Sequence, residues 1–576
     1  MNKKIYILLA ALILAFVPKG TGQIVPKKYL FNQTPTHAEL ISTYKALELR
    51  HNTTCKLVEY GKSDAGNPIH LFIIDSDGEF SASEIKRAGK KIIFIMNGIH
   101  AGEPDGIDAS LEFAEDVMLD KELRGYLDNV TIIIMPVYNV DGMLKRGNTR
   151  VNQNGPEEYG FRANSRNLDL NRDCIKTDSK NAQVLARFFT EWSPEFFIDT
   201  HVSNGADYRY VMTLIPTAPD KLEEPQKIYM RSELLPKLFE GMKKSGFEMA
   251  PYVNMKGATP DSGILAFNDS PRYTIGLASQ FGILGFTTET HMLKPFADRV
   301  KATKAFITLL YKELGQNYDK VSVLKKQAEY ATKKSEGFFL NFENDLSRSE
   351  TFLFKGYEAE YKPSEITGAK RLYYNHNRPF EREIAHYAYL RGKNFSSKPA
   401  YYLIPQEWPE IIEKLQLNGV LLDALEEDTL VSAEVYLIED FKDPYVYEGR
   451  ALVQPLKVNT IKKTMKAKAG DVMVVMGTEK DKFVMSVLEP MAKDSYLQWG
   501  FFNSVLERKE HFSAYVFEDL ALDILKKNPA LKAQMDEYFN KNSDLNTPEN
   551  KLEYIYLHSG YAEPEKGVYP IYRVMP

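Results

Sequence analysis

The chain has 576 residues, of which 44% are hydrophobic and 26% charged, with a formal net charge of -5 at pH 7. This composition is that of a globular protein and excludes a disordered or collagen-like chain, and the length predicts at least two domains. Because the chain has neither a strongly basic stretch nor an acidic tail, we expect neither nucleic acid nor a basic protein as its partner.

Residues 1–23 have the pattern of a secretory signal peptide. Asn2-Lys3-Lys4 supplies positive charge, and an apolar block follows from Ile5 to Val17. The block is shorter than the roughly 20 apolar residues of a membrane helix, so we favour a cleaved signal over an uncleaved anchor. No later stretch is long and apolar enough to span a bilayer. The expected protein is therefore secreted or periplasmic, without a stable membrane span after signal removal.

The chain contains only two cysteines, Cys55 and Cys174. Export permits a disulfide between them, and two buried free thiols are equally compatible with the sequence. Two cysteines are too few for a cysteine-based zinc site, so any zinc has to be bound by histidine and carboxylate groups.

Residues 24–320 alternate short apolar strands with helices. The expected helices are Thr36–His51, Pro104–Met118, Asn181–Trp192, Leu222–Lys244 and Pro295–Leu314. The expected strands are a pair within Lys56–Ser76, then Lys90–Met96, Asn129–Pro136, Pro194–Thr200 and Phe281–Glu289. A long loop is expected over Val137–Asp173, and loops of this length inside a domain are usually functional. This alternation predicts an α/β fold, a mixed sheet flanked by helices on both faces.

The rest of the chain has a different character. Residues 318–336 are polar and rich in lysine, which predicts a linker. Beyond it, residues 337–576 are expected to form a β-rich α+β accessory domain of unknown role, by default a structural or a glycan- or protein-binding module. The expected strands there are Phe338–Phe342, Ala400–Ile404, Leu430–Leu437 and Asp471–Met476, and the expected helices are Pro409–Leu417 and Val516–Lys527.

Polar residues follow the buried strands of the first domain. In α/β sheets, sites gather at the carboxyl ends of the strands, and this rule selects His100, Asn139, His201 and Glu289. His100 and Glu103 are three residues apart and can reach one ion if the backbone turns tightly. Such a His-x-x-Glu pair also occurs by chance. With His201 as a third ligand, however, one position is left open for water, which is the arrangement of catalytic zinc.

Two further patterns surround these residues. Arg162, Arg166 and Arg172 are concentrated in the long loop, and arginine pairs with carboxylates and holds oxyanions. An ordinary basic surface loop would look the same. Glu289 leaves an apolar strand, where a carboxylate is costly unless it is paired or used, and beside a metal it would suit a general base. Considered by itself, Glu289 could equally be a glutamate at the end of a strand whose charge is paired with another group and which has no catalytic role.

Taken in order, these residues resemble the zinc metallocarboxypeptidases of the carboxypeptidase A and B type. The resemblance covers residues 40–315 and rests on six elements in the order of the family. They are His100/Glu103, Asn139-Val140-Asp141-Gly142, Arg162, Asp169-Leu170-Asn171-Arg172, His201 and Phe286-Thr287-Thr288-Glu289.

The resemblance implies a role for each residue. His100, Glu103 and His201 would bind one Zn²⁺, and Asp169 would orient His100. Glu289 would be the general base toward zinc-bound water and then the proton donor to the leaving amine. Arg162 would stabilise the oxyanion, with Arg166 as its nearest competitor. Asn171 and Arg172 would bind the substrate's terminal carboxylate, so the expected partner is a peptide or protein with a free C-terminus.

The chain departs from the family at the tyrosine that caps the substrate. Phe267 stands at the usual separation, and the nearest candidate is Tyr273, beside which Arg272 could instead meet substrate charge. These changes bear on substrate preference rather than on chemistry.

The predicted function is therefore hydrolysis of C-terminal peptide bonds by a zinc metallocarboxypeptidase. Two alternatives use the same zinc chemistry: a deacylase acting on N-acyl amino acids and a hydrolase of cell-wall peptides. A third is a non-catalytic binding protein that keeps the cleft, against which the complete set of site residues argues.

Overall fold

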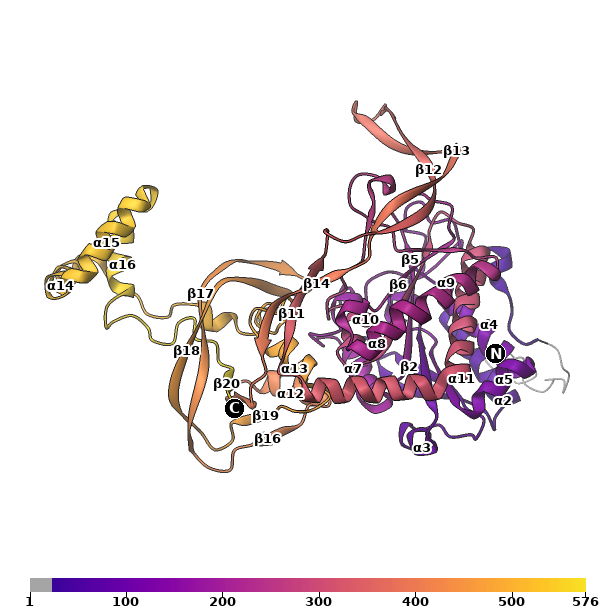
Figure 1. Cartoon of the computed structure of the whole chain (residues 1–576), viewed down its shortest axis with the longest axis horizontal. Helices are drawn as coiled ribbons and strands as arrows, with labels where there is room; N and C mark the ends of the chain where they lie inside the picture. Colours follow the sequence, from indigo (N-terminus) through magenta and orange to yellow (C-terminus); the bar gives the residue numbers. More distant parts are fainter. Residues whose placement is uncertain (1–22) are drawn as a thin grey trace, which may run out of the picture.

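The computed structural model describes residues 23–576 (Figure 1), so the predicted signal peptide lies outside the described residues except for Gln23. None of the helices within residues 23–576 combines the length and the apolar character that crossing a bilayer requires.

An eight-stranded mixed sheet forms the centre of the N-terminal half. Its strand order is β1-β2-β4-β3-β5-β10-β6-β7, and the four middle strands are parallel. The strands are β1 (Cys55–Lys62), β2 (Pro68–Ile74), β3 (Lys91–Met96), β4 (Val130–Met135), β5 (Phe196–Ser203), β6 (Met212–Pro216), β7 (Met249–Pro251) and β10 (Leu284–His291). The predicted mixed α/β sheet is confirmed.

Helices cover both faces of this sheet. Neighbouring residues of a strand point to opposite faces, so one strand contacts helices on both sides. Phe197 of β5 packs against Phe189 of α7, whereas Phe196 packs against Phe286, which contacts Phe306 of α11 on the other side. The middle strands are therefore buried on both faces, which explains their unbroken apolar sequences. The helices of this half are α2 (His37–Arg50), α3 (Ala82–Ala88), α4 (Asp105–Leu119), α5 (Lys121–Gly125), α6 (Val140–Leu144), α7 (Lys180–Trp192), α8 (Glu224–Tyr229), α9 (Leu235–Lys244), α10 (Thr274–Ser279) and α11 (Phe296–Lys334).

The predicted linker over residues 318–336 is wrong, because α11 continues through it to Lys334 with a break in helical geometry at Asn317. The second half of the helix buries Val321, Leu324 and Ala328, which recur at helical spacing along one face. Its lysines are mostly on the opposite, solvent side, which gives the sequence its polar character. The predicted helix over 222–244 is also divided, since a π turn at Met230–Leu234 separates α8 from α9.

The C-terminal half is rich in strands, as predicted. A two-stranded sheet pairs β11 with β14, a four-stranded sheet has the order β12-β13-β9-β8, and a six-stranded sheet has the order β16-β19-β15-β20-β17-β18. The strands of these sheets are β11 (Gly337–Asn344), β12 (Glu350–Pro363), β13 (Lys370–Tyr387), β14 (Leu390–Ser397), β15 (Tyr401–Ile404), β16 (Leu422–Ala424), β17 (Thr429–Tyr447), β18 (Arg450–Ala467), β19 (Val472–Val475) and β20 (Tyr572–Val574), together with β8 (Asn254–Met255) and β9 (Ile264–Leu265), which the N-terminal half contributes to the four-stranded sheet. The helices are α12 (Pro409–Leu417), α13 (Asp481–Leu488), α14 (Ala514–Lys527), α15 (Pro529–Lys541) and α16 (Pro548–Leu557).

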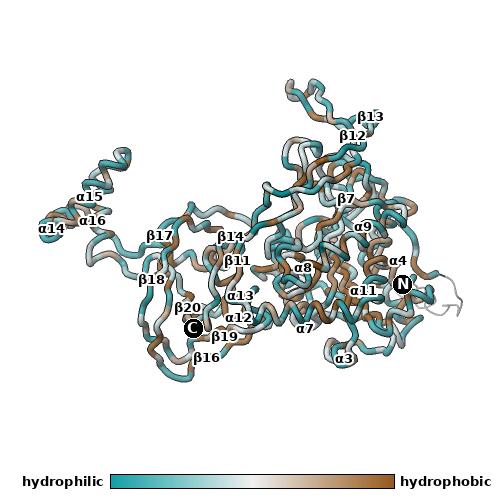
Figure 2. The backbone as a smooth tube through the Cα atoms, in the orientation of Figure 1, coloured by the Kyte–Doolittle hydropathy of each residue, from teal (hydrophilic) through white to brown (hydrophobic). Residues whose placement is uncertain are grey.

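The two halves share one hydrophobic core, which includes the ring contact of Phe281 with Phe483 at 5.3 Å between centroids. Helices α14, α15 and α16 form a separate small unit that projects from the six-stranded sheet in Figure 1 and has its own apolar cluster. Apolar residues gather along the central sheet in Figure 2, while the projecting β12–β13 hairpin is mostly hydrophilic. Cys55 and Cys174 are both buried free thiols, which decides between the two alternatives for the cysteines.

Candidate functional site

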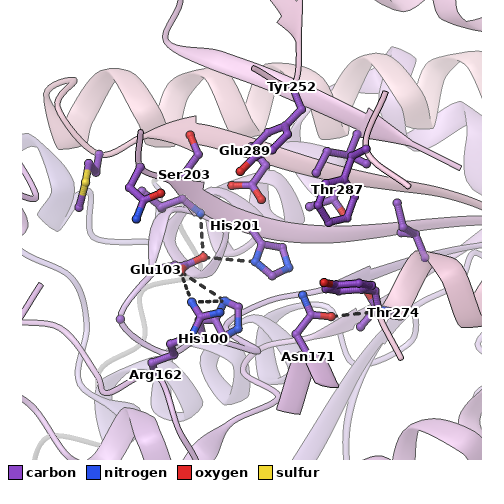
Figure 3. A pocket seen from close by; sticks show the side chains of 18 of the residues that line it. His100, Glu103, Arg162, Asn171, His201, Ser203, Tyr252, Thr274, Thr287 and Glu289 are labelled. Carbon is purple, nitrogen blue, oxygen red and sulfur yellow. Dashed lines mark hydrogen bonds and ion pairs between the residues drawn. The ribbon is translucent and has the colours of Figure 1, made fainter. Parts of the chain in front are cut away.

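A cleft of about 660 Å³ opens at the carboxyl ends of β3, β5 and β10. His100 follows β3 by four residues, and His201 and Glu289 lie near the ends of β5 and β10. Because β5 and β10 pair in parallel with His201 opposite Glu289, the register of the sheet brings these two side chains to the same edge. Three of the four predicted strand-end residues, His100, His201 and Glu289, therefore face one cleft (Figure 3). The fourth, Asn139, does not line the cleft: it is fully buried and caps α6, accepting from the backbone N–H of Gly142 at 2.9 Å.

His100, Glu103 and His201 form a candidate metal site. One ligand atom from each lies within 4.8 Å of the others, and all three residues are buried. The Nδ1 atom of His100 is 3.3 Å from Glu103 Oε1, and that of His201 is 3.2 Å from Glu103 Oε2. Ligands at tetrahedral zinc, about 2.0–2.1 Å from the ion, are separated by roughly 3.3 Å. The donor set and its spacing therefore fit a zinc ion.

Two aspartates hold the histidine rings. The Nε2 atom of His100 lies 3.0 Å from Asp169 Oδ1, and that of His201 lies 2.8 Å from Asp199 Oδ2. A carboxylate accepts a hydrogen bond from Nε2–H, which keeps the proton on Nε2 and leaves Nδ1 unprotonated toward the metal position. The role of Asp169 was predicted from the sequence, whereas that of Asp199 was not. A signal was present, since Asp199 is an acidic residue inside the apolar run of β5, two residues before His201 on the same face.

The carboxylate of Glu103 is kept ionised. Its burial alone would raise its pKa, but Arg150 and His100 outweigh burial and hold that pKa well below its usual range. Arg150 Nη1 lies 2.7 Å from Glu103 Oε1, and the backbone N–H of Val202 donates to Oε2 at 2.8 Å. Arg150 was not predicted from the sequence, because it lies in the irregular segment after α6 and has no motif around it.

Glu289 faces the candidate metal site and is partly exposed to the cleft. Burial raises its pKa to about 7, with His201 opposing and Glu103 reinforcing the shift. A carboxyl group with a pKa near neutrality can both take and return a proton at physiological pH.

Arg162 lies on the opposite side of the site from Glu289. Its guanidinium donates to Asp169 Oδ2 at 2.8 Å and lies 3.4 Å from Glu103 Oε1, and its side chain is 47% exposed. Arg166, its competitor in sequence, points elsewhere: it donates to the carbonyl of Asp178 and does not line the cleft.

Asn171 and Arg172 line the cleft together with Tyr273. The guanidinium of Arg172 lies 4.7 Å from the centre of the Tyr273 ring, a cation–π contact. Asn171 Oδ1 accepts from the backbone N–H of Thr274 at 3.3 Å, which leaves its amide nitrogen toward the cleft.

The structure distinguishes among the remaining candidates for contact with the substrate. Arg272 is not available for substrate charge, because it forms an ion pair with Asp494 at 2.6 Å. Phe267 and Tyr273 both line the cleft, and so does Tyr252, whose phenol ring lies beside Glu289 in Figure 3. Tyr252 packs edge-on against Phe267 with ring centres 5.8 Å apart. Tyr252 was not predicted from the sequence, since it stands fifteen positions before Phe267, the expected place of the tyrosine.

Comparisons with known proteins agree with this geometry. Residues 40–206 match the family model described as zinc carboxypeptidase, a segment that contains His100, Glu103 and His201. Among curated relatives, carboxypeptidase 2 of Trichophyton rubrum is 22% identical over 488 residues, covering 81% of this chain and 84% of the relative. The probable carboxypeptidase 2 of Arthroderma benhamiae is also 22% identical and covers 83% of this chain and 88% of the relative. Both alignments are long enough to include much of the C-terminal half.

Among solved structures, a putative carboxypeptidase A of Shewanella denitrificans is 15% identical, covers 49% of this chain and 69% of its own, and has a TM-score of 0.38. Bovine thrombin-activatable fibrinolysis inhibitor is 15% identical, covers 52% of this chain and 99% of its own, and has a TM-score of 0.37. Residues 40–206 are thus similar to the zinc carboxypeptidase family, and they contain the two histidines and the glutamate that form the candidate metal site.

Proposed function

We propose that this protein is a zinc metallocarboxypeptidase that releases single residues from the C-terminus of peptides. The observation that carries the proposal is the meeting of His100, Glu103 and His201 in a cleft that also contains a carboxyl group of raised pKa, Glu289. Together with the arginines of the cleft, these groups make a complete set of ligands, base and anion-binding residues for peptide hydrolysis.

Each residue of the cleft has a proposed task. A zinc ion held by the two imidazoles and Glu103 would polarise the scissile carbonyl and lower the pKa of water in the cleft. Glu289 takes a proton from the attacking water and passes it to the leaving amine. Arg162 donates hydrogen bonds to the carbonyl oxygen as negative charge develops on it. Water is consumed, the peptide bond is broken, and a free amino acid and a shortened peptide leave.

The selection of a C-terminal residue is assigned to Asn171 and Arg172. A planar guanidinium binds a carboxylate through two parallel hydrogen bonds, and the structure places Arg172 in the cleft with its ring partner Tyr273. We also retain Tyr273 as a substrate-binding residue and add Tyr252, because its phenol lies beside Glu289. Export to the periplasm or the medium remains part of the proposal.

The test is Glu289→Gln, assayed against wild type with three substrate classes: peptides with free C-termini, N-acyl amino acids and muropeptides. We expect wild type to release C-terminal amino acids, and the variant to keep its metal while turnover falls roughly 10²- to 10⁴-fold. Glu537→Gln, at an exposed position of α15, is the matched control and should be fully active. Cleavage of only acyl amino acids or muropeptides would identify one of the alternatives, and normal turnover by Glu289→Gln would refute the assignment of the base.

A further inference from the structure

The turn that joins β17 and β18 lies against the proposed carboxylate-binding residues. Tyr447 ends β17 and Arg450 begins β18, and the two form a cross-strand pair. The two residues between them, Glu448 and Gly449, have φ values of 47° and 78°. Positive φ at both positions is the signature of the tight two-residue hairpin turn whose twist matches its strands. The end of this hairpin is therefore a stiff element.

Two side chains of the turn bind residues of the site that are far away in sequence. The Nε–H of Arg172 donates to the phenolic oxygen of Tyr447 at 3.1 Å. The backbone N–H of Asp169 donates to Glu448 Oε2 at 2.8 Å. One contact thus reaches the proposed carboxylate-binding arginine, and the other reaches the residue that holds the ring of His100.

The turn is itself anchored to the N-terminal half. Arg450 makes two hydrogen bonds of 2.7 Å, from Nε and Nη2, to the carboxylate of Asp178. Its guanidinium also lies 3.6 Å from the centre of the Phe501 ring. On the other strand, the ring of Tyr447 stacks near Trp499, which is fully buried. The position of the Tyr447 hydroxyl is therefore fixed from both strands.

These contacts determine which hydrogen-bond donors of Arg172 are occupied by the protein and which remain available to a ligand. Nε is occupied by Tyr447, Nη1 donates to the carbonyl of Asn171 at 2.8 Å, and one face of the guanidinium covers the Tyr273 ring. Within residues 23–576, Nη2 has no hydrogen-bond partner in the protein. Because Arg172 lines the cleft, its Nη2 donors remain available to a ligand there while the rest of the guanidinium is held by the protein.

We propose that the β17–β18 turn is part of the carboxylate-binding site and that Tyr447 is a positioning residue for Arg172. The inference rests on the proposed function, in which Arg172 binds the terminal carboxylate of the substrate. It assigns the C-terminal half a task in substrate binding: the hairpin holds in place an arginine that lies 275 positions earlier in the chain. Tyr447 touches Arg172 and acts through it.

The test compares Tyr447→Phe with wild type in steady-state hydrolysis of a peptide that has a free C-terminus. Phenylalanine keeps the ring packing on Trp499 and removes only the hydroxyl that accepts from Arg172. We expect KM to rise roughly 2- to 13-fold, as for the loss of one ordinary hydrogen bond, with kcat changed less than about twofold. Tyr445→Phe, two residues earlier and 56% exposed, is the matched control and should leave both constants unchanged.

A double-mutant cycle separates positioning from a general structural effect. In an Arg172→Lys background, which lacks Nε, Tyr447→Phe should have no further effect on KM if it acts through the arginine. An unchanged KM in Tyr447→Phe, or equal effects of the substitution in both backgrounds, would overturn the inference while the proposed function stands. Absence of C-terminal release by wild type would instead refute the proposed function, and the inference with it.

Discussion

The register of the sheet determines the position of Glu289, and its buried surroundings determine the pKa of its carboxyl group. Its position opposite His201 follows from the parallel pairing of β5 and β10. Burial then raises its pKa to about 7, while His201 opposes that shift. A carboxyl group on an exposed strand end would have a pKa near 4.3 and would be a weaker base at neutral pH. The apolar sequence of β10 therefore contributes to the basicity of Glu289 as well as to the fold.

The pH profile follows from this ionisation. In the proposed mechanism Glu289 acts as a carboxylate, so hydrolysis is expected above the pKa of Glu289 and should be lost as the pH falls through it. A divalent cation on the three ligands adds positive charge nearby and lowers the pKa, so we expect the acid limb of kcat/KM at or below about pH 7. A pH series of kcat/KM checks this. The residual activity of Glu289→Gln should lack the limb, and an identical limb in that variant would assign it to another group.

For individual site residues, most of the predictions came from the order of the motifs along the chain. His100, Glu103, His201 and Glu289 meet in one cleft, and Asn171, Arg172 and Tyr273 line it. Asp199, Arg150 and Tyr252 were missed because their roles depend on geometry. Asp199 contacts a neighbour on its own strand, whereas Arg150 and Tyr252 reach the site from irregular segments. Arg272 was misjudged because its partner, Asp494, is 222 residues away.

Helix α4 begins two residues after Glu103 and fixes the ligands through a close contact with β5. Gly106, in its first turn, faces Thr200, the neighbour of His201. A Cβ atom at Gly106 would lie 2.0 Å from Thr200 Oγ1 and 2.6 Å from Asn97 Oδ1. The absence of a side chain there is therefore what lets the helix approach the strand that carries the third ligand.

Gly106→Ala is expected to destabilise the protein and to disturb the metal site together. Overpacking at such a contact costs about 1–3 kcal/mol of unfolding free energy, and displacement of Thr200 moves His201. Denaturant unfolding and zinc affinity measure the two effects. Gly125→Ala is the control, since that helical glycine has nothing within 4 Å of its added Cβ and should gain up to about 1 kcal/mol. Equal stability of the two variants would contradict the packing argument.

Element prediction succeeded where periodicity and burial agree. The strands and helices that were predicted within residues 36–315 lie within a few residues of their observed ends, except at the C-terminal end of α11. The strands β6 and β7 and the short helices α3, α5, α6 and α10 were not predicted. The second half of α11 was missed because Val321, Leu324 and Ala328 form a narrow apolar face among many lysines. The composition of this segment resembles that of a linker, and only the helical spacing of those three residues distinguishes a helix from a linker.

In the whole molecule, most of the C-terminal half shares one hydrophobic core with the N-terminal half. Helices α14–α16 are the exception, since their buried apolar side chains form a separate cluster. The three-helix unit buries its own cluster, which includes Phe517, Met535 and Phe539. The chain enters and leaves this unit at neighbouring points, because Glu563 accepts from the backbone N–H of Lys509 at 2.8 Å. The sequence could not reveal this division, since both parts are equally globular in composition.

Two deletions should therefore behave differently. Replacing residues 511–561 by a short glycine-serine linker should leave kcat/KM within roughly twofold of wild type, because the unit is an independent cooperative element. Ending the chain after Lys334 should abolish soluble, active protein, since it uncovers Phe281 and other apolar side chains of the shared core. Solubility and peptidase assays measure both. An active fragment of residues 24–334 would show that the halves are independent.

The zinc content of the purified protein tests the metal site most directly, measured by elemental analysis together with peptidase activity. Wild type should contain about one zinc per chain, and His201→Ala should lose both the metal and turnover, because two ligands do not retain a catalytic ion. His558→Ala, at an exposed ring stacked on Tyr554, should keep both. Full zinc content and normal hydrolysis in His201→Ala would contradict a metal site formed by His100, Glu103 and His201.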